Sequence, residues 1–254
     1  MSQTVLQVRG LHRRFGLTPI LRGIDLELAD GECLGVIGPN GAGKSTLFNV
    51  ISGALAPSAG DVLLRGRSIA GQPPHALARL GLARSFQISQ LFEQLTVAEH
   101  LRLACLPALG LCADGWRGLR GALASMPEVQ AALALWLDRL DLGEQQHSRP
   151  AQLSYAQQRM LELGLTLAGE PRVILLDEPT AGMSRSETEQ FVHRLRALTQ
   201  GRALMLVEHD MQVVFELADR VAVLHEGRLL ACGTPDEVRR DPAVRSIYLA
   251  GLPC

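Results

Sequence analysis

The chain has 254 residues, a length that suits one large α/β domain with a subdomain inserted in it. Its formal net charge of -1, with no run of basic residues, argues against nucleic-acid partners. The five cysteines form no CxxC pair, which fits a protein of the reducing cytoplasm. No stretch is long and apolar enough to span a bilayer, so we expect that another chain would have to anchor this one if it works at a membrane.

The first part of the chain predicts strands and then a helix. The short apolar runs "VLQVRG", "ILRGIDLEL" and "ECLGVIG" are broken by Gly and Asp, which is typical of strands. After Gly43 the sequence "KSTLFNVISGAL" has helical spacing, with Leu47, Val50 and Ile51 on one face and Gly53 at its end. A glycine-rich loop is therefore expected between a strand and a helix.

The middle part predicts helices only. Three pairs of residues have the spacing of a capping box, and each predicts the start of a helix: Thr96 with Glu99, Ser125 with Glu128, and Ser154 with Gln157. The last of these helices is expected to end at Gly169. We therefore predict an inserted all-helical subdomain over residues 89–164.

Strand signals return in the last part of the chain. The continuous apolar runs "RVILLDEP" and "ALMLVEH" predict buried strands of a parallel sheet. The sequence "RVAVLHEGRLLACG" predicts a hairpin that turns near Gly227, and Thr234 with Glu237 predicts a short final helix. Residues 1–88 and 165–254 are thus expected to form the two parts of one α/β core.

The glycine-rich stretch carries the most specific motif. Gly38-x-x-x-x-Gly43-Lys44-Ser45 is the complete phosphate-loop pattern. Glycines let backbone N–H groups converge on a phosphate, Lys44 can reach the outer phosphates, and Ser45 can offer its hydroxyl to magnesium. The nucleotide-binding residues predicted from the loop are Gly38, Pro39, Asn40, Gly41, Ala42, Gly43, Lys44, Ser45 and Thr46.

Carboxylates and a histidine follow the two buried strands. Asp177 and Glu178 stand where "VILLDEP" leaves the sheet, and His209 ends "ALMLVEH". Burying two carboxylates is costly unless a magnesium–nucleotide complex compensates them. Ligands of open α/β sheets gather at this edge, so we expect Asp177 to hold magnesium through water, Glu178 to polarise the attacking water, and His209 to contact the γ-phosphate or orient the water.

These motifs together resemble a known family. With "LSYAQQR" and "LLDEPTAG", the chain resembles the ATP-binding subunits of ABC transporters nearly end to end. It is most similar to the ATPases of branched-chain amino-acid and related amide or urea importers, through "GLARSFQISQLFEQLTVAEHL", "VEHDM" and "GTPDEVRRDPAVRSIYLAG". The resemblance implies ATP hydrolysis on a P-loop NTPase core, a RecA-like and mostly parallel sheet, with N-terminal antiparallel strands and an inserted helical subdomain.

The resemblance also implies roles for further residues. Phe15 matches the aromatic residue that stacks on adenine, and Gln87 matches the glutamine that contacts magnesium and the attacking water. Gln87 would thus be a magnesium-binding residue together with Ser45 and Asp177. It would also be a catalytic residue together with Glu178 and His209. The signature motif, which would close over the ATP of an opposite subunit, is Leu153, Ser154, Tyr155, Ala156 and Gln157.

Three departures from the family pattern concern turnover. Ala156 replaces the usual glycine of the signature motif, and a positive φ there would cost about 1 kcal/mol and weaken closure. The loop "PTAGMSRSE" lacks an aspartate found in many ABC ATPases, and "ELGLTLAGEP" lacks a frequent arginine. These departures bear on the rate of hydrolysis more than on the fold.

The implied partners are a second ATP-binding subunit, two integral membrane permease subunits and, indirectly, a solute-binding protein outside the cell. The two ATP-binding subunits would pair head to tail, as two copies or as two related chains, at the cytoplasmic face of the inner membrane. An exporter-type ATPase, as in lipopolysaccharide extraction, and a soluble ABC protein outside transport are the alternatives. The transported solute is left open.

Overall fold

The computed structural model describes residues 3–85, 91–111 and 126–247. The chain divides into two compact units. The first consists of Met1–Arg84, Arg172–Ala181 and Thr199–Cys254, and the second of Ser85–Pro171 and Gly182–Leu198. The second unit thus includes Gly182–Leu198, a segment that the boundaries expected from the sequence placed in the core.

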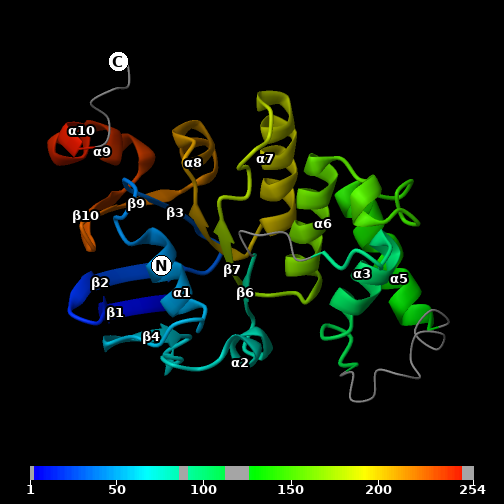
Figure 1. The fold of residues 1–254 in the computed structure, drawn as a ribbon, viewed down its shortest axis with the longest axis horizontal. Helices are drawn as coiled ribbons and strands as arrows, with labels where there is room; N and C mark the ends of the chain where they lie inside the picture. The colour runs from blue at the N-terminus through cyan, green and yellow to red at the C-terminus, as the bar shows by residue number, and fades with distance from the viewer. Residues whose placement is uncertain (1–2, 86–90, 112–125, 248–254) are drawn as a thin grey trace. The chain divides into compact units, whose positions relative to one another are not determined.

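A six-stranded sheet of the first unit carries the buried strands predicted from the apolar runs (Figure 1). Its order is β10-β9-β3-β8-β7-β6, and all neighbours pair in parallel except the β9–β10 hairpin. Every residue of β7 and β8 is buried, as expected for strands covered on both faces. The strands are β3 Cys33–Ile37, β6 Leu82–Arg84, β7 Val173–Asp177, β8 Ala203–Val207, β9 Arg220–His225 and β10 Arg228–Gly233.

The N-terminal strands form a separate antiparallel sheet with the order β2-β1-β4-β5. Buried and solvent-facing residues largely alternate along β2, because one face of this sheet covers the core and the other meets solvent. The predicted antiparallel strands are therefore confirmed, while β4, β5 and β6 were not predicted. The strands are β1 Thr4–Phe15, β2 Thr18–Ala29, β4 Ala59–Leu64 and β5 Arg67–Ser68.

Among the described residues, five helices belong to the first unit. The first of them, α1, begins at Lys44 directly after the glycine-rich loop and has Gly43 as its N-cap. The capping box predicted at Thr234 and Glu237 is present at the start of α9. The helices are α1 Lys44–Ile51, α2 Pro74–Arg79, α8 Met211–Leu217, α9 Pro235–Arg240 and α10 Pro242–Ile247.

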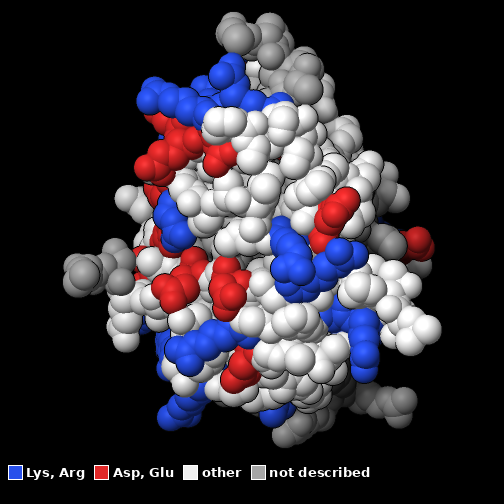
Figure 2. Space-filling view, turned by 90° about the vertical axis from the view of Figure 1, so that its left-hand side faces the viewer, with Lys and Arg blue, Asp and Glu red and all other residues white. Residues whose placement is uncertain are grey.

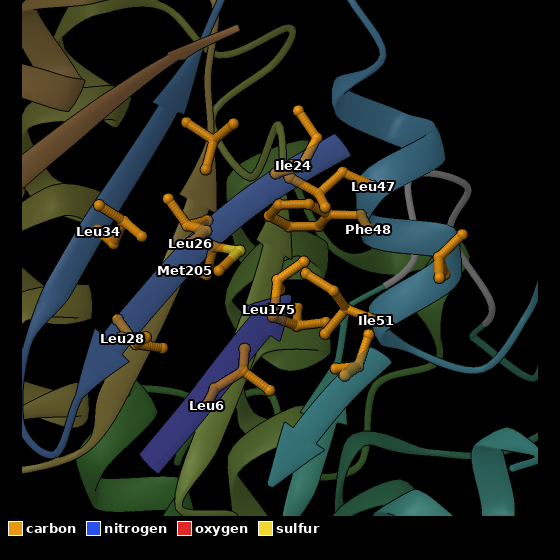
Figure 3. Close-up of a cluster of buried hydrophobic side chains, with 14 of the residues drawn as sticks. Leu6, Ile24, Leu26, Leu28, Leu34, Leu47, Phe48, Ile51, Leu175 and Met205 are labelled. Carbon is orange, nitrogen blue, oxygen red and sulfur yellow. The ribbon is translucent and has the colours of Figure 1, made fainter. Parts of the chain in front are cut away.

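The main core of the first unit lies where α1 meets strands of both sheets (Figure 3). Leu47, Phe48 and Ile51 of α1 are fully buried and point toward side chains of β1, β2, β7 and β8. This packing fixes the start of α1, and therefore the glycine-rich loop, against the sheet. Strand residues of the same cluster labelled in Figure 3 are Leu6, Ile24, Leu26, Leu28, Leu34, Leu175 and Met205.

All described secondary-structure elements of the second unit are helices, joined by turns and loops. Helix α6 begins at the predicted capping box of Ser154 and Gln157 and ends at Gly169, and α3 begins at that of Thr96 and Glu99. Helices α3, α5 and α6 pack on one another. The elements are α3 Val97–Cys105, α5 Pro127–Leu140, the short 3₁₀ helix η1 Pro150–Gln152, α6 Tyr155–Ala168 and α7 Arg185–Thr199.

The prediction that Ser125 caps α5 is wrong. The N-cap of α5 is Met126, which has no side-chain capping bond, and the helix begins at Pro127. A residue before proline is pushed out of the helical region, so Met126 takes the extended N-cap conformation and Pro127 the first helical position. Ser125 itself lies outside the described residues.

The charge distribution agrees with the balanced composition. Figure 2 shows Lys and Arg side chains interspersed with Asp and Glu on the face that it presents, with uncharged atoms between them. No helix within the described ranges is long and apolar enough to cross a membrane.

We predict that the α1 core contributes strongly to stability. Leu47 is fully buried, so Leu47→Ala is expected to lower the free energy of unfolding by about 3 kcal/mol. The same substitution at Leu17, which is 96% exposed, should change it by less than about 0.5 kcal/mol. Urea unfolding of both variants, followed by circular dichroism, measures the difference. Equal losses would contradict the packing shown in Figure 3.

Candidate functional site

The glycine-rich loop joins β3 to α1, as the sequence predicted. Gly41 and Gly43 have φ values of 80° and 106°, in the left-handed region that favours glycine. A Cβ atom on Gly43 would also lie 2.9 Å from the Leu21 Cδ2 atom. The loop thus needs glycine for its backbone path, and that path leads to the free N–H groups at the start of α1.

Lys44 is the buried cation of the loop. Its side chain is only 6% exposed, and its Nζ donates hydrogen bonds to the carbonyl oxygens of Gly38 at 2.7 Å and Pro39 at 3.2 Å. Burial lowers the pKa of Lys44, and the nearby carboxylates Glu178 and Asp177 oppose that shift. The loop therefore holds its ammonium group close to both carboxylates that the sequence singled out.

The β9–β10 turn braces the loop. The Gly227 N–H donates to the Ala42 carbonyl at 3.0 Å, and the Gly227 carbonyl accepts from the Arg22 N–H of β2 at 2.8 Å. A Cβ atom on Gly227 would collide with the carbonyl oxygen of Ile20. The predicted hairpin turn at Gly227 thus links the loop to the N-terminal sheet.

Asp177 ends β7 and is the buried anion of the site. Its Oδ2 atom accepts a hydrogen bond from the Arg84 guanidinium at 2.9 Å. Burial raises the pKa of Asp177, and the nearby charge and hydrogen bond of Arg84 are the main influences that oppose this shift. Arg84 was not among the predicted site residues.

Glu178 and His209 meet at the same edge of the sheet. Asp177 is paired in register with Val207, and the Glu178 N–H donates to the Val207 carbonyl at 2.8 Å. Glu178 has a φ of 50°, a strained conformation for a residue with a Cβ atom. This turn directs its Oε1 atom to within 2.8 Å of the His209 Nε2 atom.

A second buried carboxylate fixes this edge. Glu208 is 2% exposed, and its Oε1 atom accepts hydrogen bonds from the Thr180 N–H at 2.8 Å and the Thr180 hydroxyl at 2.7 Å. Burial raises the pKa of Glu208, and the bonds from Thr180 oppose that shift. Glu208 thus joins the turn that carries Glu178 to the end of β8. The sequence indicates Glu208 only as a carboxylate that directly follows an apolar run.

Two further predicted residues are Phe15, at the end of β1, and Gln87, outside the described ranges. Phe15 is the last residue of β1, 48% exposed, and the Arg13 guanidinium carbon lies 4.7 Å from the centre of its ring. Its ring is therefore available for stacking on a flat group such as a purine. Gln87 lies outside the described residues, and its expected role stays a prediction.

The predicted signature motif forms the start of α6 in the second unit. The Ser154 hydroxyl accepts from the Gln157 N–H at 3.2 Å, and the Gln157 Oε1 atom accepts from the Ser154 N–H at 2.9 Å. Tyr155 is exposed and accepts hydrogen bonds from Arg159. Ala156 lies in the first turn of α6 and is not among the residues with positive φ, so the strain considered for it does not arise.

Side-chain oxygen atoms of Ser45 and Asp177 suit magnesium, but too few protein oxygens are present among the described residues to bind it without phosphate oxygens. The Ser45 hydroxyl is exposed at the start of α1, and Asp177 supplies a carboxylate; both are hard oxygen donors of the kind that magnesium prefers. Within residues 3–85, 91–111 and 126–247, no group of three or more His, Cys, Asp or Glu could hold a metal ion.

Comparison with known proteins decides the family. Residues 21–181 match the ABC transporter family. The chain belongs to the ABC transporter family. It is therefore an ATP-binding cassette with the ATPase activity of transporter subunits. Residues 228–249 also match the description "branched-chain amino acid ATP-binding cassette transporter".

Relatives match over nearly the whole chain. The high-affinity branched-chain amino acid transport ATP-binding proteins LivG of Salmonella typhimurium and BraF of Pseudomonas aeruginosa are 37% and 36% identical, over 98% of this chain and 99% of theirs. Among solved structures, the ADP conformation of MJ1267, an ATP-binding cassette of an ABC transporter, is 28% identical with a TM-score of 0.82, over 98% of this chain and 99% of that one. The predicted fold class is confirmed.

We predict that Thr180 stabilises the chain through Glu208. Thr180→Val keeps the shape of the side chain but removes the hydroxyl donor from a buried carboxylate, so it should lower the free energy of unfolding by about 1–3 kcal/mol. Thr18→Val, on an exposed position of β2, is the matched control and should cost less than about 0.5 kcal/mol. Urea unfolding at neutral pH measures both, and a Thr180 variant as stable as the control would be inconsistent with this bond.

Proposed function

We propose that the chain is the ATP-hydrolysing subunit of an importer for branched-chain amino acids or a related amide or urea, acting through a separate membrane permease. The similarity to LivG and BraF over the whole chain supports this assignment. The match of residues 228–249 to branched-chain amino acid cassettes supports import over the exporter alternative. The solute itself would be selected by other subunits.

The single observation that carries hydrolysis is the meeting of Lys44, Asp177, Glu178 and His209 at one sheet edge. The loop N–H groups and Lys44 would bind the outer phosphates of ATP. Ser45, Asp177 and Gln87 would hold magnesium, which supplies neutralisation of the phosphate charge when bound. Phe15 would stack on the adenine ring.

Glu178 and His209 are placed to act on water. Glu178 can polarise a water molecule and accept its proton, and His209 Nε2, bound to Oε1 at 2.8 Å, holds the carboxylate in place. The strained turn at Glu178, fixed by Glu208 and Thr180, supports this orientation. We infer that Glu208 and Thr180 act by holding Glu178 in place rather than by contacting ATP.

The signature motif would act on the ATP of a second ATP-binding subunit. Ser154 caps α6, so free N–H groups and the positive end of the helix dipole are available at this point for an anion. A head-to-tail pair, of two copies or of two related chains, would place these groups over the partner's γ-phosphate. ATP then joins the subunits and hydrolysis separates them, which gives a two-state element for driving a permease.

The first test of this proposal is Glu178→Gln. Removing the base should leave the affinity for ATP unchanged, stop turnover and trap the ATP-bound dimer, because the phosphate contacts remain while the water is not activated. Size-exclusion chromatography with ATP and magnesium measures the dimer, and phosphate release measures turnover.

Lys44→Ala is the matched negative variant. It should lose ATP binding and remain monomeric, because the outer phosphates lose their buried cation. A Glu178→Gln protein that stays monomeric at saturating ATP would contradict the head-to-tail pairing around ATP. A Lys44→Ala protein that hydrolyses ATP like the parent would refute the site itself.

The importer assignment predicts coupled transport at the cytoplasmic face of the inner membrane. Affinity purification of the chain from membranes should retain two integral membrane proteins, and the complex in proteoliposomes should take up labelled leucine with ATP and a solute-binding protein. The complex with Lys44→Ala should assemble but not transport. ATP-dependent extraction of lipopolysaccharide by the purified complex would instead favour the exporter alternative.

A further inference from the structure

Arg84 stands between the two elements that would hold the metal. It is the last residue of β6, and its side chain is 13% exposed. Its Nη2 atom donates to Asp177 Oδ2 at 2.9 Å, while its Nη1 atom donates to the Asn49 Oδ1 atom at 2.7 Å and to the Ser52 Oγ atom at 2.9 Å. One side chain therefore bonds both to β7 and to α1.

The bonds to α1 distinguish two roles for this guanidinium. Asn49 lies near the end of α1 and Ser52 is its C-cap, whereas Ser45 lies in the first turn of the same helix. A cation that only replaced the metal beside Asp177 would have to leave when the metal binds. The two bonds to α1 do not involve the carboxylate, so they hold the guanidinium in place whether or not a metal is present.

We propose that Arg84 is a positioning residue for the magnesium site, which sets the orientation of the Asp177 carboxylate relative to Ser45 by bonding β7 to α1. This inference rests on the proposed function, because it assumes that magnesium binds with ATP. A guanidinium suits the task since its planar fork makes several bonds of fixed direction, which a lysine ammonium does not. Outer partners of this kind commonly tune how tightly a metal is held.

The resemblance assigned no role to Arg84, although the stretch "GLARSFQISQLFEQLTVAEHL" contains it. Its signal in the sequence is a basic residue at the end of a short apolar stretch, where β6 ends.

The test is the coupling between metal and nucleotide. Binding of a fluorescent ATP analogue is measured in the Glu178→Gln background, once with EDTA and once with magnesium, and the ratio of the two affinities gives the coupling. Arg84→Met should bind the analogue in EDTA as the unsubstituted background does, but its ratio should fall by about tenfold. The ratio for Arg84→Lys should lie between that of the unsubstituted background and that of Arg84→Met. None of these readouts depends on turnover.

Two further variants guard against a simple loss of folding. Arg172→Met removes the exposed ion pair with Asp30, at 3.5 Å, and should leave the ratio unchanged. The double variant of Asn49→Ala and Ser52→Ala keeps the Arg84–Asp177 pair but removes its anchors, and should lower the ratio by about threefold. Circular dichroism confirms folding.

The outcomes separate this inference from the function on which it rests. An unchanged or higher ratio in both Arg84→Met and the double variant would overturn the positioning role, and a higher ratio would identify Arg84 as a competitor of the metal. If the Glu178→Gln background itself bound no analogue, or bound it equally with and without magnesium, the proposed nucleotide site would be wrong instead.

Discussion

The burial of opposite charges at one edge of a parallel sheet is the constraint on which the site depends. Lys44 is 6% exposed and Asp177 is 3% exposed, and neither charge would be stable there alone. Each is compensated by backbone carbonyls or by Arg84. The packing of α1 on both sheets holds these compensating groups in place, so the core shown in Figure 3 is also the support of the site.

The sequence predicted where most residues of the candidate site lie, because its motifs coincide with element ends. The glycine loop, the carboxylates after β7 and the histidine after β8 all follow apolar runs, and parallel strands bring such ends to one edge. Arg84 and the Glu208–Thr180 pair escaped prediction because their partners are distant in sequence, and only the folded chain brings them together. The short strands β4 to β6 escaped for a related reason, since few residues carry little periodicity.

Errors in the predicted helices have local causes. A capping box needs its serine directly before the first helical residue, and Pro127 took that first position, which made Met126 the N-cap. For Ala156 the predicted penalty depended on a positive φ, but the residue lies inside α6, where alanine is the most favourable residue. The absence of the family's glycine is therefore compatible with an intact helix start.

Nucleotide binding at the proposed site would exchange internal partners rather than fill empty contacts. Lys44 bonds to loop carbonyls at 2.7 and 3.2 Å, and Glu178 bonds to His209 at 2.8 Å. Phosphate oxygens and the attacking water would compete with or add to these bonds, so the net affinity would be smaller than the sum of the new contacts. A site built in this way can release its product after hydrolysis, because the charged groups return to internal partners instead of being left buried and unpaired.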